Sequence, residues 1–448
     1  MIVLSTVTAR ARQLSCADPN YDAKLARQLG MSVTTPSRVH SKPKPEKGFR
    51  VERKSANVTI NGVKKKVSYN LYHAAKKPAH GTVVVLGGGP GFVNTDGGRP
   101  KDLPKDVDVV VFDYNGVGDN GGKSLPPDQL SIEAEAEMTK GIIKSAKLEN
   151  YAIYGISFGT TVGTVATSMI EHDPDMTGPK SLVLSGVVSN EPVIDHAAGR
   201  AAVANAAWNM LTPKQQTDFK RAYKKITRGM SKKNIELMDQ TWVGNLTFSP
   251  KRVAKMLNNF SAVVNGKRKP SPPEPMDNAA SSDDSLLVSS PQAIRQFRAA
   301  GCEMLGNSHE PPSAEKLFGG LIPNRDEQQL GTMCGCPLLS DKAYDSKNYP
   351  IEDTPIVYVN SDTDVSTPLQ SAKYHFDNQP TDTKFMFVTK NGVHDDLAWR
   401  YADCAAPFWH ASLVGDLDAV KNAAAGMGTD GCEKAAPVQM ASGPGVSR

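Results

Sequence analysis

The sequence predicts an α/β fold: a mostly parallel central sheet with helices on both faces and a large helical cap inserted after the sixth strand. Three observations predict it. Short runs of consecutive apolar residues recur along the chain, which is typical of strands buried on both faces of a parallel sheet. Helical patterns separate several of these runs. One connection, from Val188 to Pro355, is about 165 residues long, far longer than a single helical crossover requires.

A β-hairpin opens the regular part of the chain. Residues 51–60 and 63–72 alternate apolar and polar side chains around Asn61-Gly62, a dipeptide that favours a two-residue hairpin turn. The buried strands are then expected at 81–86 (GTVVVL), 107–112 (VDVVVF), 151–154 (YAIY), 181–188 (SLVLSGVV), 355–360 (PIVYVN) and 384–388 (KFMFV).

Helices are expected between the strands and throughout the long connection. Two belong to the sheet, at 131–148 and 160–171, and the connection contributes four more, at 197–211, 213–229, 250–264 and 292–305. A stretch of low complexity at 267–285 divides the connection. The domain prediction is an N-terminal arm or linker at 1–47, a core at 48–190 and 351–432, a mainly helical cap at 191–350, and a flexible tail at 433–448.

Composition excludes several classes of protein. Of the 448 residues, 39% are hydrophobic and 22% are charged, as expected for a globular chain. A net charge of +5, spread along the sequence, argues against a nucleic-acid partner. Because no apolar stretch reaches about 20 residues, we expect no membrane span. No signal peptide is visible, and the oligomeric state stays open.

A candidate nucleophile lies in the stretch Gly155-Ile156-Ser157-Phe158-Gly159. This G-x-S-x-G pattern alone is common. Here it follows an expected buried strand and precedes an expected helix, which is the context of a nucleophile elbow. The two glycines would allow neighbouring segments to approach the sharp turn closely. We therefore predict that Ser157 is a catalytic nucleophile rather than an ordinary loop serine.

A serine nucleophile needs a base and an acid, and two later loops can provide them. The loop after 384–388 contains His394, the histidine of the chain that stands directly after an expected strand. The loop after 355–360 contains both Asp362 and Asp364. The spacing of Asp364 to the following Thr367-Pro368 favours it as the acid, which leaves Asp362 as a turn residue. Asp395 and Asp396 are expected to tether the loop or face solvent.

An oxyanion hole requires N–H donors that are already in place around the developing charge. We expect one from Phe158, the residue after the nucleophile. The second is expected from the glycine loop 87–92 (GGGPGF), in which Gly88 and Gly89 are the candidate donors and Pro90 cannot donate. No metal or organic cofactor is implied by this constellation.

Five motifs in order resemble the prolyl aminopeptidase branch of the α/β-hydrolases. They are GGGPGF at 87–92, DYNGVGD at 113–119, YGISFGTTVGTVATSMIEHDPD at 154–175, DTDVSTP at 362–368 and NGVHDD at 391–396. Within this branch the sequence is most similar to tripeptidyl aminopeptidases and proline iminopeptidases. Gly87 and Asn115 depart from the family pattern, which has His and Arg at these positions. The resemblance implies a serine exopeptidase that acts at peptide N-termini, with the cap limiting access.

The resemblance also implies further features. An aminopeptidase of this kind needs an acidic group in the cap for the substrate's α-ammonium, and Glu303 is a candidate. Relatives carry a C-terminal cysteine pair, to which Cys404 and Cys432 correspond, and Cys302 could pair with Cys334 or Cys336. The pairing of these five cysteines and Cys16 stays open. Disulfides would suit a secreted or periplasmic protein.

Two other functions remain open at this stage. A carboxylesterase or related ester hydrolase would use the same triad of Ser157, His394 and Asp364, because the fold does not select amides over esters. The substrate is therefore predicted to be a peptide or a small ester. A binding protein without catalytic activity on the same scaffold is disfavoured by the complete triad.

Overall fold

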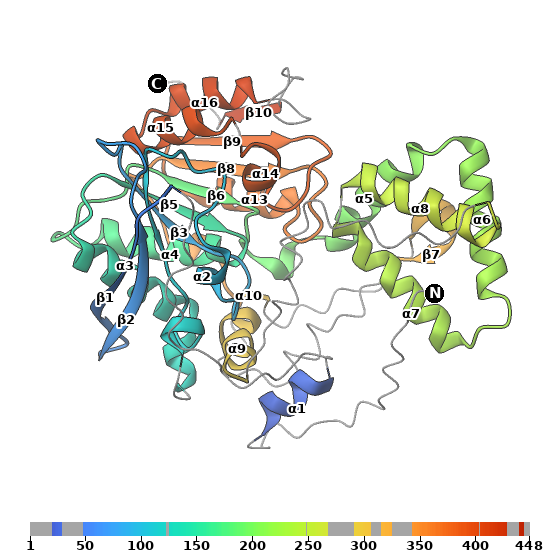
Figure 1. The fold of residues 1–448 in the computed structure, drawn as a ribbon, viewed down its shortest axis with the longest axis horizontal. Helices are drawn as coiled ribbons and strands as arrows, with labels where there is room; N and C mark the ends of the chain where they lie inside the picture. The colour runs from blue at the N-terminus through green and yellow to red at the C-terminus, as the bar shows by residue number, and fades with distance from the viewer. Residues whose placement is uncertain are drawn as a thin grey trace.

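The computed structural model describes residues 20–28, 48–121, 125–247, 249–267, 291–305, 315–324, 343–402, 404–427 and 439–442. Its centre is a nine-stranded sheet in the order β1-β2-β4-β3-β5-β6-β8-β9-β10 (Figure 1). The strands from β4 to β9 run parallel to one another, whereas β1, β2 and β10 pair antiparallel at the two ends of the sheet. The predicted α/β fold, a mostly parallel central sheet, is confirmed.

The strands from β3 to β9, except β7, lie where the apolar runs predict them, whereas β7 and β10 were not predicted. The hairpin strands and their register around Asn61-Gly62 match the prediction to the residue. In chain order the strands are β1 Val51–Ile60, β2 Val63–Tyr72, β3 Thr82–Leu86, β4 Asp108–Val111, β5 Tyr151–Ile156, β6 Leu182–Ser185, β7 Ile322–Pro323, β8 Ile356–Ser361, β9 Lys384–Thr389 and β10 Gln439–Ser442.

Helices cover both faces of the sheet. One face packs against α3 (Ile132–Ala146), α4 (Phe158–Glu171) and α13 (Leu369–Asn378). The other face packs against α14 (Asp396–Arg400), α15 (Ala406–Val414) and α16 (Leu417–Gly426). The sheet strands are buried on both sides as a result, which explains why their sequences read as continuous apolar runs.

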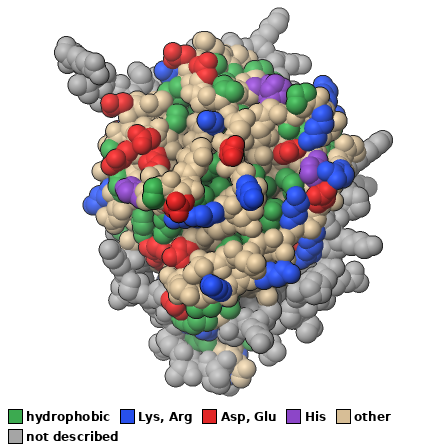
Figure 2. All heavy atoms as spheres, turned by 90° about the vertical axis from the view of Figure 1, so that its left-hand side faces the viewer, with side chains coloured by type: hydrophobic (Ala, Val, Ile, Leu, Met, Phe, Trp, Pro, Cys, Tyr) green, Lys and Arg blue, Asp and Glu red, His purple; other side chains and the backbone are tan. Residues whose placement is uncertain are grey.

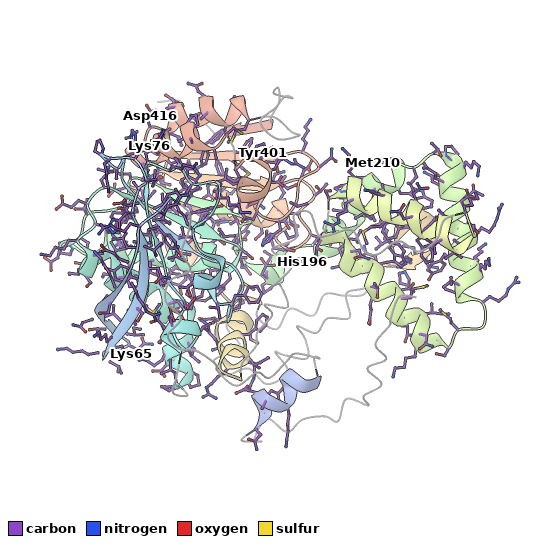
Figure 3. All side chains as sticks on the ribbon, viewed as in Figure 1. Lys65, Lys76, His196, Met210, Tyr401 and Asp416 are labelled. Atoms are coloured by element: carbon purple, nitrogen blue, oxygen red, sulfur yellow. The ribbon has the colours of Figure 1, made fainter. Side chains whose placement is uncertain are left out.

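A helical lobe follows β6, the sixth strand in the chain, and stands to the right of the α/β body in Figure 1. It contains α5 (His196–Asn209), α6 (Pro213–Thr227), α7 (Lys232–Gly244), α8 (Pro250–Val264), α11 (Leu317–Gly320) and β7. Its core forms around Phe219, whose ring contacts Trp242 at 5.5 Å and Phe260 at 5.7 Å between centroids. Figure 3 shows His196 where the lobe joins the body and Met210 within the lobe.

The segment 291–305 belongs with the α/β body, although its sequence predicts a place in the cap. It comprises α9 (Pro291–Gln296), a π-helical turn at Phe297–Gly301 and α10 (Cys302–Leu305). Gln296 Nε2 donates to Glu135 Oε1 of α3 at 2.9 Å, and Arg295 Nε donates to Leu125 O at 3.0 Å. The predicted single helix at 292–305 is therefore correct in position but widens in its middle.

The N-terminal arm contains one described helix, α1 (Tyr21–Gln28), which packs against this segment. Arg298 pairs with Asp22, and its guanidinium carbon lies 4.2 Å from the centre of the Tyr21 ring. Part of the predicted arm is thereby held against the body.

Short elements complete the described fold. They are α2 (Asn94–Gly97) and the 3₁₀ turns Gly118–Asn120, Pro127–Leu130, Glu191–Val193, Asn245–Thr247 and Ser346–Asn348. On the face seen from the left of Figure 1, Lys and Arg side chains are interspersed with Asp and Glu (Figure 2). Among the described helices, none has the length and apolar character that a membrane crossing requires.

The two cysteines that the structure describes, Cys302 and Cys404, are both disulfide-bonded. Cys16, Cys334, Cys336 and Cys432 lie outside the described residues. The pairings expected from the family resemblance therefore stay predictions, as does the expected flexibility of residues 433–448, of which only the stretch 439–442 is described.

Candidate active site

Ser157 occupies a strained turn between β5 and α4. Its backbone has φ 53° and ψ −122°, a conformation that residues with a side chain adopt at an energetic cost. The Ser157 N–H donates to Ser185 O at 2.8 Å, so the turn is tied to the end of β6. Such strain persists only where neighbouring segments fix the backbone, and it projects the serine at the carboxyl edge of the parallel strands.

Two glycines make this turn possible. A Cβ at Gly159 would lie 2.0 Å from Leu86 O, and a Cβ at Gly155 would lie 2.6 Å from Gly159 O. Both distances are far shorter than any real contact, so neither position can accept a side chain without moving the backbone. The glycines of the G-x-S-x-G pattern are therefore required by close approach of neighbouring chain segments, as the sequence predicts.

The predicted acid and base contact one another. His394 Nδ1 lies 2.8 Å from Asp364 Oδ2, although the two residues come from loops after different strands, β8 and β9. Asp364 is also fixed by its own loop, because Thr367 Oγ1 donates to Oδ2 at 2.6 Å and the Thr367 and Ser366 N–H groups donate to Oδ1. With Nδ1 facing the carboxylate, Nε2 is the imidazole nitrogen that can take a proton from a hydroxyl.

The electrostatics of the pair favour a charged imidazolium beside a carboxylate. Burial would raise the pKa of Asp364, but the facing His394 and the Thr367 hydrogen bonds outweigh it and hold that pKa below its usual value. Burial likewise opposes charge on His394, yet Asp364 outweighs it and raises the pKa of His394 above 6.5. Each partner thus stabilises the ionised form of the other.

The serine and the imidazole lie on either side of the end of β6. Ser157 bonds through its N–H to Ser185, and the next residue, Gly186, lies against His394. A Cβ at Gly186 would be 2.7 Å from His394 Cε1. Ser157, His394 and Asp364 are therefore gathered at one edge of the sheet, where the chain order predicted them.

The neighbouring aspartates have other partners. Asp362 Oδ1 accepts the Asn391 N–H at 2.7 Å, so Asp362 joins the acid loop to the base loop as a turn residue. Asp396 accepts hydrogen bonds from Thr389 and Val393, as expected for a residue that tethers the loop. The alternative that these residues face solvent is wrong for Asp396, which is buried.

Asp395 differs from both. It is half-buried, and its Oδ1 accepts from Tyr154 Oη at 3.1 Å and from Ser185 Oγ at 2.9 Å. Burial raises the pKa of Asp395 to about 6 despite these donors. The residue anchors the base loop to β5 and β6, which is the loop-tethering role that the sequence predicts, although its two donors could not be named because they are distant in the chain.

The glycine loop lies against the nucleophile. A Cβ at Gly88 would be 3.0 Å from Ser157 Cβ, and Gly89 adopts a positive φ of 62°. The Phe158 N–H is in the first turn of α4, which has its amino end at Ser157. The amino end of α4, which is the positive end of its dipole, and the Phe158 N–H therefore lie near the place where negative charge would develop on the substrate.

Two neighbouring residues brace this region: Tyr114, which the sequence reasoning did not single out, and Asn115, which it noted as a departure from the family pattern. Tyr114 Oη donates to Gly87 O at 2.8 Å, which fixes the start of the glycine loop. Buried Asn115 donates its N–H to Glu135 Oε2 at 2.9 Å and its side-chain amide to Gln129 O at 2.6 Å. Asn115 thus holds the loop after β4 without a charge of its own.

Glu303, the candidate for binding an α-ammonium, lies beside a second carboxylate. Its Oε2 accepts the Ile132 N–H at 3.0 Å at the start of α3. Burial, followed by the charge of Glu133, raises the pKa of Glu303 to about 8. Tyr349 Oη donates to Glu133. Because α3 follows β4, its amino end lies at the same edge of the sheet as Ser157.

This acidic pair is connected to the glycine loop. A Cβ at Gly301, two residues before Glu303, would lie 3.0 Å from Pro90 Cγ. The π-helical turn that contains Gly301 therefore packs directly on the loop expected to form the oxyanion hole. π-helical turns occur frequently at functional sites.

Comparison with known proteins shows that this chain is similar to several solved structures. No family model and no curated protein matches the chain. Proline iminopeptidase from Mycobacterium smegmatis is 13% identical with a TM-score of 0.43, covering 83% of this chain and 100% of that one. An esterase from Thermogutta terrifontis is 13% identical with a TM-score of 0.39, covering 78% and 93%. Bromoperoxidase from Bacillus anthracis is 13% identical with a TM-score of 0.38, covering 77% and 94%. At these values no residue role or substrate passes from those proteins to this chain.

Proposed function

We propose that this protein is a serine hydrolase in which Ser157, His394 and Asp364 form the catalytic triad. The observation that carries the proposal is the 2.8 Å contact between Asp364 and His394, next to a serine with φ 53° on a strand–turn–helix junction. A strained, partly exposed serine beside an imidazole that a carboxylate orients is the arrangement of an activated nucleophile.

The proposed reaction proceeds through an acyl-enzyme. His394 Nε2 takes the Ser157 hydroxyl proton as Oγ attacks the substrate carbonyl carbon. Asp364 orients the imidazole and stabilises its charged form, while the N–H groups of Phe158 and of Gly88 or Gly89 stabilise the oxyanion. His394 then protonates the leaving amine or alcohol. A water molecule deprotonated by His394 releases the acyl group in the second half-reaction.

Within this class we propose an aminopeptidase that releases residues or short peptides from peptide N-termini. The support is the carboxylate pair Glu303 and Glu133, together with Gly301, two residues before Glu303, which packs on Pro90 of the glycine loop. Two carboxylates held together in a half-buried site repel each other, and this repulsion adds to burial in raising the pKa of Glu303 to about 8. A substrate α-ammonium would relieve the repulsion and donate hydrogen bonds to both groups.

Labelling and turnover test the hydrolase proposal. A fluorophosphonate probe should label the native protein at Ser157 and should leave Ser157→Ala unlabelled. The same variant should lose turnover by a factor on the order of 10⁴ or more. Full turnover by Ser157→Ala of every substrate that the native protein cleaves would contradict the assignment.

A substrate panel tests the peptidase against the ester hydrolase. Aminoacyl and tripeptidyl naphthylamides with a free N-terminus are compared with their N-acetylated forms and with p-nitrophenyl esters. Dependence on a free amine supports the aminopeptidase. Turnover restricted to esters would leave the triad assignment intact, but it would contradict the aminopeptidase proposal and support an esterase.

We further propose that the protein acts outside the cytoplasm, in a secreted or periplasmic form. The disulfide-bonded state of Cys302 and Cys404 supports this location, because structural disulfides persist in oxidising compartments. Fractionation of cells that express the full-length gene, with immunodetection of the protein in each fraction, tests the location. Recovery of the oxidised protein in the cytoplasmic fraction alone would contradict it.

A further inference from the structure

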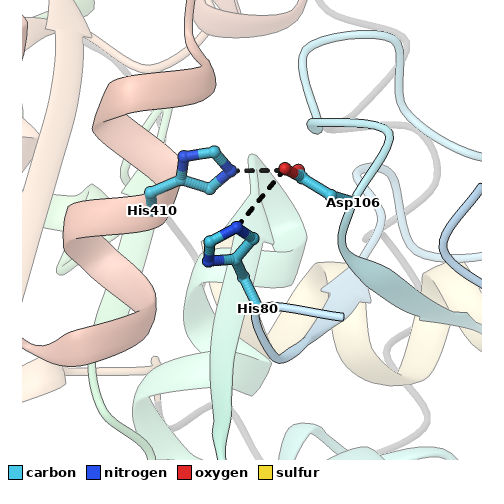
Figure 4. A group of neighbouring side chains, drawn as sticks. All are labelled: His80, Asp106 and His410. Carbon is cyan, nitrogen blue, oxygen red and sulfur yellow. Dashed lines mark hydrogen bonds and ion pairs between the residues drawn. The ribbon is translucent and has the colours of Figure 1, made fainter. Parts of the chain in front are cut away.

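A second group of functional side chains lies at the opposite edge of the sheet from Ser157. It consists of His80, Asp106 and His410 (Figure 4). His80 precedes β3 and Asp106 precedes β4, so both are at the amino ends of parallel strands, whereas Ser157 follows the carboxyl end of β5. The cluster therefore has no part in the proposed hydrolytic reaction, and any role it has is independent of that reaction.

The fold fixes the three residues from separate parts of the chain. The His80 N–H donates to Asp106 O at 2.9 Å, and Asn150 Nδ2 donates to His80 O at 2.9 Å. His410 belongs to α15, which is anchored by its fully buried neighbour Trp409. The backbone positions of all three residues are thus set by sheet pairing and by helix packing, before their side chains interact.

The side chains converge on one small volume. His410 Nε2 lies 3.0 Å from Asp106 Oδ1, and His80 Nε2 lies 3.5 Å from Asp106 Oδ2. The two imidazole rings stack with 4.4 Å between their centroids and 24° between their planes. One potential ligand atom from each residue lies within 4.8 Å of the other two. Figure 4 shows both rings presenting a nitrogen to the carboxylate.

We propose that His80, Asp106 and His410 form a site for a divalent transition-metal ion of the Zn²⁺ class. Metal–ligand distances of about 2.0–2.2 Å in a tetrahedral site place ligand atoms roughly 3.3–3.5 Å apart. The two imidazole–carboxylate separations, 3.0 Å to Oδ1 and 3.5 Å to Oδ2, are near this value, and side-chain rotations bring one carboxylate oxygen and both nitrogens to it. Two neutral imidazoles and one carboxylate are a Zn²⁺ ligand set, whereas Ca²⁺ and Mg²⁺ prefer oxygen ligands.

Charge and access agree with this assignment. With both rings neutral, the cluster carries the single negative charge of Asp106, which a divalent cation neutralises in excess. The His80 side chain is 55% exposed and that of His410 is 34% exposed, so an ion can enter from solvent and a water molecule can complete the coordination.

A metal at this site would act as a cross-link. Asp106 and His410 are 304 residues apart in sequence, and the ion would join the last part of the chain to the amino ends of β3 and β4. Binding to the folded state alone stabilises that state in proportion to the logarithm of metal concentration. The expected consequence is higher thermal stability of the α15 region with no change in the hydrolytic step.

The test uses the full-length protein without a histidine tag, stripped with a chelator and then titrated with Zn²⁺ by calorimetry. We expect one ion per chain at this site and a rise in Tm with Zn²⁺ concentration. His410→Ala and Asp106→Asn should each weaken the affinity at least ten-fold, because even loss of an outer-shell partner of a ligand costs about that much. Co²⁺ should give the visible absorption of a tetrahedral ion in the native protein.

A matched control is His172→Ala, which removes an exposed histidine whose Nδ1 bonds to Ser168 O at the end of α4, on the opposite face of the sheet from α15. This variant should keep the native Zn²⁺ affinity. The proposal is overturned if the native protein binds no Zn²⁺, or if His410→Ala and Asp106→Asn bind it as the native protein does. If a variant fails to fold, His80→Gln, at the most exposed position, provides the same comparison.

Discussion

Asp364 Oδ2 lies 2.8 Å from His394 Nδ1, while Asp362, two residues earlier, bonds instead to the Asn391 N–H. The two aspartates therefore form a natural pair of test sites in one loop. Asp364→Asn should lower kcat by a factor of about 10³–10⁴, because an amide no longer stabilises the imidazolium or fixes its tautomer. Asp362→Asn should stay within a few-fold of the native rate. If steady-state assays instead showed the larger loss of kcat in Asp362→Asn, Asp362 would be the acid of the triad and Asp364 the turn residue.

The pH dependence of the same variants gives a second prediction. Asp364 raises the pKa of His394 above 6.5, and His394 must be neutral to act as a base. The native kcat/KM should therefore fall as the pH drops through a midpoint above 6.5. In Asp364→Asn the residual activity should have its midpoint at lower pH. A midpoint that does not move, measured on an N-acetylated or ester substrate, would contradict the coupling.

Gly159 should be nearly intolerant of a side chain. A Cβ there would lie 2.0 Å from Leu86 O, so Gly159→Ala must displace the elbow or β3. We expect a loss of at least about 2 kcal/mol in unfolding free energy, with loss of activity. Gly163→Ala, one turn later in α4, places its Cβ 3.3 Å from Leu182 Cδ1 and should be tolerated within about 1 kcal/mol. Urea unfolding of both variants is the measurement, and equal losses would argue against a specific clash.

The substitution Glu303→Gln should weaken the binding of substrates that have a free amine. Because the pKa of Glu303 is about 8, the native kcat/KM for free-amine peptides should fall below that pH more steeply than for N-acetylated ones. The variant should raise KM for the former about ten-fold or more, with little effect on the latter. Glu352→Gln, at an exposed position, is the control. Equal effects on both substrate types would assign Glu303 a structural role.

Glu135 should make stability depend on pH. Burial raises the pKa of this carboxyl to about 8. A raised acid pKa means that the folded state binds the proton more tightly, so the stabilising contribution is complete below the unfolded pKa, near 4.5, and is lost as the pH rises to about 8. Relative to the native protein, Glu135→Gln should gain on the order of 5 kcal/mol across this window, because the pKa shift from 4.5 to about 8 corresponds to that free energy. Chemical unfolding at several pH values measures it, and a constant difference would refute the assignment.

Peptide mapping without reduction should find Cys404 joined to Cys432 and Cys302 joined to Cys334 or Cys336. Both described cysteines are disulfide-bonded, and the partners follow from the family resemblance. Mass spectrometry of the digest identifies the linked peptides, and the reduced digest is the control. A bond from either residue to Cys16 would show a different framework.

Local patterns were sufficient for most of the sheet. The register of the Asn61-Gly62 hairpin and the position of every strand from β3 to β9, except β7, follow from alternation or from apolar runs, since these strands are set by burial. Helix α7 was missed because much of its surface is exposed, so its periodicity is weak. β10 was missed because its pairing with β9 depends on a strand distant in sequence.

The residues of the candidate site could likewise be predicted only in part from the sequence. Ser157, Asp364 and His394 follow strand ends, and the carboxyl ends of parallel strands meet at one edge, so their meeting could be predicted. The pairing of Glu303 with Glu133 could not, because it depends on how segment 291–305 packs on α3. The cluster of His80, Asp106 and His410 likewise depends on where α15 lies on the sheet.

The helical lobe also has a consequence for biosynthesis. β6 pairs with β8 in the finished sheet, yet the ribosome must produce the entire lobe between them first. Until β8 emerges, β6 presents an unpaired, apolar edge, which is the kind of surface on which nascent chains associate with one another. The half of the chain that carries Ser157 is also complete before His394 has been translated. Newly made protein should therefore depend on chaperones during this interval, and it should gain activity only after its last strands have been added.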